Sequence, residues 1–272
     1  MGSTPTFGQG AIQVMTASTR SVVTAAGATA LAATAFVRVD PPLVGLIPAL
    51  LLGVGAAVFA AGWPRLLGVP AQRGSSVVIA LTGWAALGSA VLTQMFSYLP
   101  AILAGGVIAA FVHQMLRKDG RPRLVESLSA TVAGVIVAVF AAGWVTTITR
   151  FLQADARAHP NPTALILTAA CALTVACVAT AFTPRAIAGT AATLAAGVLG
   201  ALLGWIFPAV GLVAGAALGA CLGLLQSSVQ HAFELFPSSR RVRPALSAAL
   251  LPVLAAGVPV YTIARVIANL GV

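Results

Sequence analysis

The chain has 272 residues, of which 59% are hydrophobic and only 7% are charged. Soluble domains carry about 25% charged residues, so this composition excludes an ordinary soluble protein. The net charge is +10, from 15 basic and 5 acidic residues, and because the basic residues stand singly or in short clusters between apolar stretches, they indicate topogenic charge and contact with anionic lipid rather than binding of nucleic acid.

Nine apolar stretches follow one another along the chain, and each is close to the roughly 20 residues that a helix needs to cross a membrane. They occupy residues 19–37, 42–63, 74–94, 98–116, 124–148, 163–182, 186–206, 208–232 and 245–268. The sequence therefore predicts an all-α, polytopic integral membrane helical bundle with about nine transmembrane helices, in which residues 19–272 form a single transmembrane domain. Residues 1–18 are rich in Gly, Ser and Thr, and we expect them to be a mobile N-terminal segment.

The basic residues between these stretches predict the orientation of the bundle. With the N-terminus in the cytoplasm, 11 basic residues lie in inside loops, namely Arg20, Arg65, Arg73, Arg117, Lys118, Arg121, Arg123, Arg185, Arg240, Arg241 and Arg243. The outside segments then hold four, namely Arg38, Arg150, Arg157 and Arg265. This distribution follows the positive-inside rule. We predict an N-in, C-out protein of the cell (inner, cytoplasmic) membrane.

Glycine and proline predict how the later helices pack and bend. Gly211, Gly215, Gly219 and Gly223 recur every four residues, and Gly200 and Gly204 do so in the preceding span. Such ridges let two helix backbones approach closely. In the last span, Pro252 and Pro259 remove backbone donors and should break or kink the helix, so that the freed carbonyl groups need other partners.

The richest polar stretch lies at the end of the eighth span, from Gln226 to Glu234. Helical spacing places Ser227, His231 and Glu234 on one face, with Gln226 and Gln230 alongside. Polar groups at membrane depth are costly unless paired, so we expect this face to point into the bundle or into an aqueous pocket. Three interpretations remain open: a hydrogen-bonded structural cluster, a pocket for a head group or solute near the cytoplasmic surface, and a catalytic Ser–His–Glu arrangement. The third is disfavoured, because three residues on one helix face seldom have the required mutual geometry.

Two basic segments are candidates for contact with phosphate. Arg240, Arg241 and Arg243 stand between Pro237 and Pro244. Arginine grips phosphate bidentately, and a cluster of this kind either does so or meets anionic lipid at the cytoplasmic face. The other segment, residues 117–123, is predicted to be a solvated basic turn.

Several segments spread along the chain carry the layout of a known enzyme family. They are Phe59–Gly68, the basic loop 117–123 with the following segment 127–132, Thr183-Pro184-Arg185, Gly223–His231, and the final span with Pro252 and Pro259. Read end to end, the chain resembles the phosphatidate cytidylyltransferase (CDP-diacylglycerol synthase) family of multi-span membrane enzymes. Thr183-Pro184-Arg185 looks like a reduced form of the family's Ser-Pro-Lys-Lys motif, and Gly223–His231 stands where the family has Gly-Asp-Leu-x-Glu-Ser-x-x-Lys-Arg.

The departures from that family concern its acidic residues. By this alignment Leu224 replaces an Asp, Ser227 a Glu and His231 a Lys, and no acid occurs between Asp155 and Glu234. The resemblance implies that such carboxylates hold the divalent cation that activates the CTP phosphates. Mg²⁺ prefers carboxylate oxygens, so neutral side chains would not hold it against a triphosphate. We therefore expect a degenerate relative of the family, with no catalytic residues, no metal ligands and no cofactor.

Three hypotheses of function follow from the sequence. The first is a non-catalytic protein of envelope lipid metabolism that binds a phospholipid or a polyprenyl phosphate, or scaffolds a membrane enzyme. Its expected partners are membrane lipids with anionic head groups and a membrane enzyme, not nucleic acid. Its candidate lipid- or phosphate-binding residues are Thr183, Arg185, Ser227, Ser228, His231, Glu234, Arg240, Arg241 and Arg243. The second is a small-solute permease or exporter. The third is an active lipid-phosphate cytidylyltransferase that uses atypical ligands such as His231 and Glu234.

Overall fold

The computed structural model describes residues 16–36, 45–93, 95–151 and 161–270, and the described residues form helices joined by short turns. The helices are α1 (Ala17–Thr34), α2 (Leu46–Leu66), α3 (Gln72–Thr93), α4 (Leu99–Met115), α5 (Leu124–Phe140), α6 (Ala142–Phe151), α7 (Pro162–Phe182), α8 (Arg185–Ile206), α9 (Leu212–Glu234), α10 (Val242–Ala255) and α11 (Gly257–Leu270). Two short 3₁₀ helices, η2 (Phe96–Tyr98) and η3 (Pro237–Arg240), precede α4 and α10. The all-α prediction is confirmed for the part of the chain that the structure describes.

Local sequence explains where several helices begin. The Thr16 side chain accepts a hydrogen bond from the backbone N–H of Thr19 and caps α1. At α7 the Asn161 side chain accepts from the N–H groups of Thr163 and Ala164, and Pro162 follows at the first helical position. Such residues satisfy backbone donors that have no partner within the helix. Of the predicted mobile segment 1–18, residues 1–15 lie outside the described residues, and α1 begins at Ala17.

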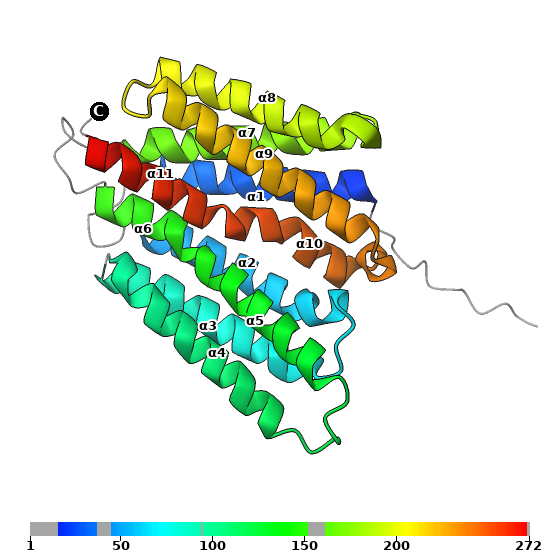
Figure 1. The fold of residues 1–272 in the computed structure, drawn as a ribbon. Helices are drawn as coiled ribbons and strands as arrows, with labels where there is room; N and C mark the ends of the chain where they lie inside the picture. The colour runs from blue at the N-terminus through cyan, green and yellow to red at the C-terminus, as the bar shows by residue number, and fades with distance from the viewer. Residues whose placement is uncertain (1–15, 37–44, 94, 152–160, 271–272) are drawn as a thin grey trace, which may run out of the picture.

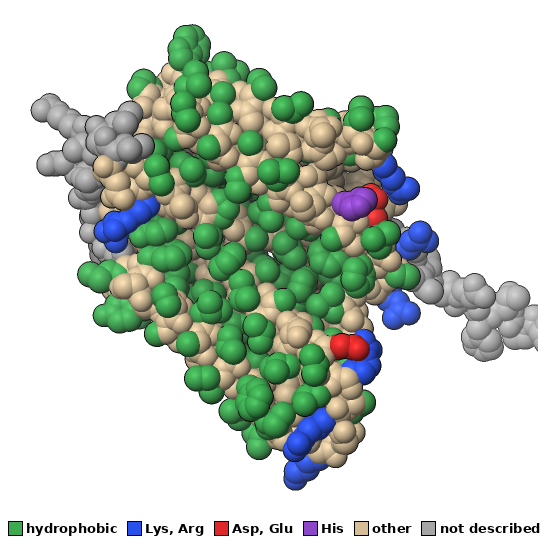
Figure 2. Space-filling model, in the orientation of Figure 1, with side chains coloured by type: hydrophobic (Ala, Val, Ile, Leu, Met, Phe, Trp, Pro, Cys, Tyr) green, Lys and Arg blue, Asp and Glu red, His purple; other side chains and the backbone are tan. Residues whose placement is uncertain are grey.

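Eight helical segments are long and apolar enough to cross a membrane, counted over the described residues. Two of them are composite, because α5 with α6 and α10 with α11 each form one segment of 28 residues. The remaining helix, α1, has 18 residues and lies within the same bundle (Figure 1). Figure 2 shows hydrophobic side chains covering the middle of the visible face. The helices thus have the length and surface of a multi-pass membrane protein.

The helices lie side by side in a bundle whose order differs from their order in sequence (Figure 1). The α8–α9 pair is at one side, α7 packs on it, and α1 packs on α7. Helix α10, the last but one of the chain, lies between α1 and α2, and α3, α4 and α5 complete the other side. A helix from near the end of the sequence is therefore central, and it contacts both α1 and α9.

Two interrupted helices cross at their breaks in the middle of the core. α5 passes into α6 at Ala141, and α10 passes into α11 at Ala256. A side chain at Gly143 would clash with the carbonyl group of Gly257, and one at Gly257 would clash with the carbonyl oxygen of Phe140. The two backbones therefore touch at this crossing, and only glycine fits at both positions.

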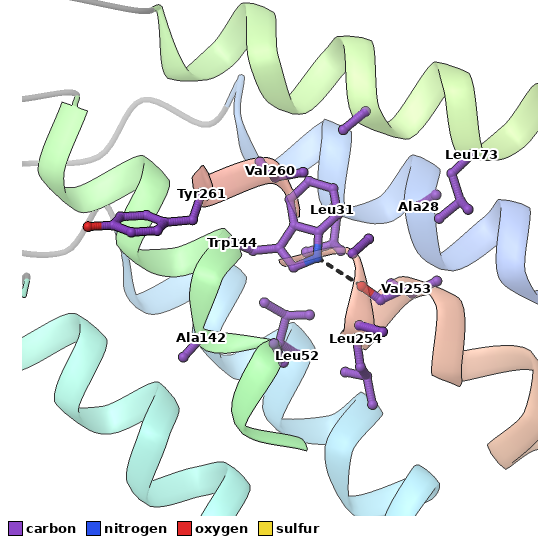
Figure 3. Close-up of a cluster of buried hydrophobic side chains, with 14 of the residues drawn as sticks. Ala28, Leu31, Leu52, Ala142, Trp144, Leu173, Val253, Leu254, Val260 and Tyr261 are labelled. Carbon is purple, nitrogen blue, oxygen red and sulfur yellow. Dashed lines mark hydrogen bonds between the residues drawn. The ribbon is translucent and has the colours of Figure 1, made fainter. Parts of the chain in front are cut away.

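The Trp144 side chain joins the two interrupted helices. Its indole Nε1–H donates to the Val253 carbonyl oxygen at 2.8 Å, and Figure 3 shows the ring among Leu31, Leu52 and Val260 from three other helices. The predicted interruption of the span 245–268 by its prolines is confirmed, with a side-chain donor serving a carbonyl near the break. The predicted span 124–148 lies within one segment of membrane-crossing length, Leu124–Phe151, but this segment is interrupted after Ala141, where α5 ends and α6 follows, and the sequence did not predict that break.

The predicted glycine ridges lie face to face between α8 and α9. A side chain at Gly200 would clash with the Gly215 carbonyl oxygen, and one at Gly204 with that of Gly211. The same holds for Gly219 against the Ala196 carbonyl oxygen. The turn between the helices contains Gly211 at a φ of +78°, a conformation that L side chains rarely adopt. The ridge therefore holds the two helices at backbone contact within one chain.

We expect Gly219→Ala to lower the free energy of unfolding by about 1–3 kcal/mol, because the added methyl group forces the two backbones apart. The matched control is Gly88→Ala in α3, where an added Cβ meets no atom within 4 Å. Reversible unfolding of both variants in detergent, followed by circular dichroism, measures the difference. Equal stability of the two variants would show that the ridge is not tightly packed.

The charges of the described residues are concentrated at one end of the bundle. This basic end carries Arg20, Arg65, Arg73, Arg117, Lys118, Arg121, Arg123, Arg185, Arg240, Arg241 and Arg243. Among the described residues, only Arg150 and Arg265 lie toward the other end. Figure 2 shows Lys and Arg side chains along the basic end, with a histidine and an acidic group beside them.

Candidate functional site

A cavity of about 340 Å³ opens between α8 and α9 at the basic end. Its polar wall from α9 consists of Ser227, Ser228, His231 and Glu234, and Arg185 faces them from the start of α8. Thr180 of α7 closes one side. Helical spacing explains the α9 wall, because Ser227, His231 and Glu234 follow one another at intervals of four and three residues.

The cavity forms because α8 and α9 diverge beyond the glycine ridge. At Gly223 an added Cβ would lie 2.6 Å from the Ala192 carbonyl oxygen. One turn further, at Gly189, the nearest atoms across the interface belong to Ser227, at 3.9 Å from the same kind of added Cβ. Close contact has therefore given way to open space at the level of Ser227, where the polar side chains begin.

Arg185 and Glu234 form the only ion pair found across this cavity among the described residues. The Arg185 Nε atom lies 3.4 Å from a Glu234 carboxylate oxygen. The Arg185 side chain is 86% exposed and that of Glu234 is 28% exposed, so the pair contributes little to stability. Arg185 is also the first residue of α8, whose N-terminus has no side-chain cap. The unpaired N–H groups and the helix dipole of such an end favour a negatively charged group.

Arg20 is a charged residue of this region that sequence reasoning missed. It was expected in an inside loop, but it lies in α1 with only 4% of its surface exposed. Its Nη2 atom donates to the Gln230 side-chain oxygen at 3.4 Å, and the Gln230 amide donates to Ser21 at 2.9 Å. Gln230 lines the cavity, so Arg20 places a buried positive charge directly behind the cavity wall.

Gln226 does not share the cavity with its neighbours on α9. It is fully buried, and neither atom of its side-chain amide has a hydrogen-bond partner within the described residues. The sequence placed Gln226 and Gln230 alongside the polar face. The structure turns Gln226 into the bundle interior, whereas Gln230 lies at the cavity wall and reaches Ser21 of α1.

A second basic cavity, of about 380 Å³, lies where α10 begins. Arg65 from the end of α2 meets Arg241 and Arg243 there, with Ser238 beside them. The Ser238 hydroxyl donates to the Leu66 carbonyl oxygen at 2.6 Å and ties η3 to the end of α2. The close approach of Gly62 to the Arg243 carbonyl group fixes α10 against α2.

Seven of the nine predicted site residues are thus divided between two cavities, and the other two line neither. Arg185, Ser227, Ser228, His231 and Glu234 share the α8–α9 cavity, and Arg241 and Arg243 share the second one with Arg65. Thr183 is the C-terminal cap of α7 and Arg240 is an exposed residue of η3, and neither lines these two cavities. The separation arises because η3 turns the chain away from α9 toward α2.

The residues of the α8–α9 cavity do not fit a divalent metal ion. Hard cations take several oxygen ligands, of which carboxylates are the strongest. Glu234 is the single carboxylate of this cavity, and it is paired with Arg185. Among the described residues, no group of three His, Cys, Asp or Glu side chains is placed to hold a metal ion. The donor set suits an anion instead.

Comparison of the chain with protein-family models, with curated proteins and with solved structures finds no match.

Proposed function

We propose that this chain binds the phosphate-bearing head group of a membrane lipid, a phospholipid or a polyprenyl phosphate, in the cavity between α8 and α9. It does so without catalysis, as a distant, degenerate relative of the CDP-diacylglycerol synthases in envelope lipid metabolism. The observation that supports this most is the convergence of Arg185, Ser227, Ser228 and His231 from two helices at the basic end. Hydroxyl and imidazole groups donate hydrogen bonds to phosphate oxygens, and arginine adds charge.

The position of the cavity favours a lipid over a free solute. Large apolar side chains near the cavity are exposed, namely Phe182 at the end of α7, Ile187 of α8 and Leu224 of α9. In a membrane these side chains contact acyl chains, so a head group can enter while its tails stay in lipid. The ligand therefore approaches from within the membrane plane.

The proposed orientation places the basic end, and hence the cavity, at the cytoplasmic face of the cell membrane. Lys and Arg accumulate in cytoplasmic loops of membrane proteins. The inner leaflet also carries anionic lipids, which such residues attract. A membrane enzyme that supplies or consumes the bound lipid is the proposed protein partner.

The test is native mass spectrometry of the detergent-purified protein after incubation with defined lipids. We expect Arg185→Ala and His231→Ala each to weaken retention of phosphatidic acid about tenfold or more, the loss expected when a hydrogen bond to a charged group is removed. Arg240→Ala is the matched control, since this exposed arginine lies at the same end and lines neither cavity described above.

The second cavity provides an internal comparison. If Arg241→Ala and Arg243→Ala weaken retention while Arg185→Ala does not, the head group binds near α10 instead and the proposal for the α8–α9 cavity fails. If all variants retain lipid like the unaltered protein, the basic residues set only the orientation of the helices in the membrane and the proposal of a head-group site fails. Formation of CDP-lipid from CTP that is lost on His231→Ala would instead support an active cytidylyltransferase.

A small-solute permease is the second candidate, and the two interrupted helices are the observation that favours it. Transporters build substrate sites from interrupted helices whose ends meet inside the membrane. Here, however, Ala141, Ala142 and Ala256 at the breaks are fully buried and Trp144 fills the space between them. Uptake of a labelled amino-acid panel into proteoliposomes tests this candidate, and flux that Trp144→Phe alters would support it.

A further inference from the structure

A third cavity at the basic end lies apart from those described above, between the start of α3 and the loop after α4. It has a volume of about 660 Å³ and is lined by residues 70–74 together with His113, Arg117, Lys118 and Asp119. The loop was predicted to be a solvated turn. Its first residue departs from that prediction, because only 6% of the Arg117 side chain is exposed.

Arg117 is held in place by two side-chain partners, Asp119 and Gln114. Its Nε and Nη2 atoms donate to the two carboxylate oxygens of Asp119 at 3.1 and 2.6 Å. Its Nη1 atom donates at 2.8 Å to the side chain of Gln114, which is fully buried and donates in turn to Ser127 of α5 at 2.9 Å. The guanidinium group thus anchors the loop to the body of the bundle.

The same contacts decide the charge of the cavity. The hydrogen bonds from Arg117 hold the pKa of the Asp119 carboxyl below its usual value, so this group is ionised at neutral pH and compensates Arg117. Arg73 and Lys118 have no such partner among the described residues. The cavity therefore carries about two uncompensated positive charges, those of Arg73 and Lys118.

The backbone of α3 and the His113 ring complete the wall. Arg73 and Gly74 belong to the first turn of α3, where backbone N–H groups have no partner within the helix. The His113 imidazole lies directly against Gly74, where any side chain would clash with the ring. The buried His113 Nε2 atom has no hydrogen-bond partner among the described residues. The His113 ring therefore fixes the position of the first turn of α3, and the backbone N–H groups of that turn are available as donors to a ligand.

We infer that this cavity binds a phosphate group, held between Arg73 and Lys118 with backbone donors from the first turn of α3. The group belongs either to a lipid head group at the membrane surface or to a free phosphate. The site stands independently of the proposed function, since it shares no residue with the α8–α9 cavity.

Lys118 allows a direct test because it is the only lysine of the chain. The rate at which an amine-reactive ester acylates Lys118 is followed by mass spectrometry of its peptide. The protein is held in buffer with inorganic phosphate, or with chloride at the same ionic strength. In a second set of samples the protein is held in vesicles of phosphatidylcholine, with or without phosphatidylglycerol, in buffer that contains no inorganic phosphate. We expect phosphate to slow acylation at least fivefold relative to chloride.

Two variants separate a defined site from general attraction to positive charge. Arg73→Gln should abolish the protection of Lys118, and Arg240→Gln, at the same end but outside this cavity, should leave it unchanged. Protection by phosphatidylglycerol vesicles as well as by phosphate would identify a lipid head group, and protection by phosphate alone would identify a free anion. Equal acylation rates in phosphate and chloride, or protection that survives Arg73→Gln, would overturn the inference. Lipid retention at Arg185 does not enter this readout.

Discussion

Replacing Trp144 with Ala is expected to lower the free energy of unfolding by about 3–5 kcal/mol, the range for removing a large aromatic side chain from a packed core. Trp144 is 1% exposed and packs among residues of α1, α2 and α11 (Figure 3). Its removal leaves a void that the neighbouring helices cannot fill without moving. It also leaves the Val253 carbonyl oxygen without the indole donor, which is costly where water is excluded.

Unfolding in detergent with increasing dodecyl sulfate, followed by circular dichroism, measures this loss. Trp84→Ala is the matched control, since Trp84 also donates its indole N–H to a backbone carbonyl, that of Gly53 at 2.9 Å, but is half exposed. We expect that control to cost about 1 kcal/mol. Trp144→Phe should fall between the two, because it retains most of the packing and removes only the hydrogen bond. Equal losses for Trp144→Ala and Trp84→Ala would contradict the central role of the crossing.

Gly143→Ala is the second change with a large expected effect, a loss of about 3 kcal/mol or more. The added methyl group would clash with the Gly257 carbonyl group. Backbone atoms cannot rotate away as a side chain can, so relief requires the two interrupted helices to separate. Separation would in turn lengthen the hydrogen bond from Trp144 to Val253. One methyl group therefore disturbs two interactions that act together.

Gly105→Ala in α4 is the control for this variant, because an added Cβ there meets no atom within 4 Å. That variant should be as stable as the unaltered protein or slightly more stable, since Ala is the better helix former. The same detergent unfolding measurement applies. If Gly143→Ala behaves like Gly105→Ala, the two helices do not touch at their breaks in solution.

Much of the fold could be predicted from the sequence, because membrane spans depend on length and composition within a single segment. The proline-dependent break in the last span could be predicted for the same reason. The break after Ala141 could not, since residues 124–148 carry no proline. That break accompanies contact with Gly257 and Val253, which are more than 100 residues away in the chain. Long-range packing of this kind leaves no local signal.

In the candidate site, too, features that depend on local sequence could be predicted and features that depend on long-range packing could not. The spacing of Ser227, His231 and Glu234 within one helix was sufficient to group them, and the structure places all three in one cavity. The burial of Arg20 could not be predicted, because a single arginine at the edge of an apolar stretch usually marks a loop. Its burial depends on α9 lying beside α1, as the contact with Gln230 shows. Arg241 lies close to the α9 residues in the sequence but not in space, because η3 turns the chain away from α9 and places Arg241 beside Arg65.

The α8–α9 pair joins a rigid part and an adjustable part in one hairpin. From Gly204 and Gly211 to Ala192 and Gly223 the backbones touch and cannot slide or separate without breaking contact along the whole ridge. Beyond Gly189 the two backbones no longer touch. The last turns of the two helices at this end can therefore bend without disturbing the backbone contact along the glycine ridge. Under the proposed function, a small movement of these last turns would admit head groups of different size while the rest of the bundle stays unchanged.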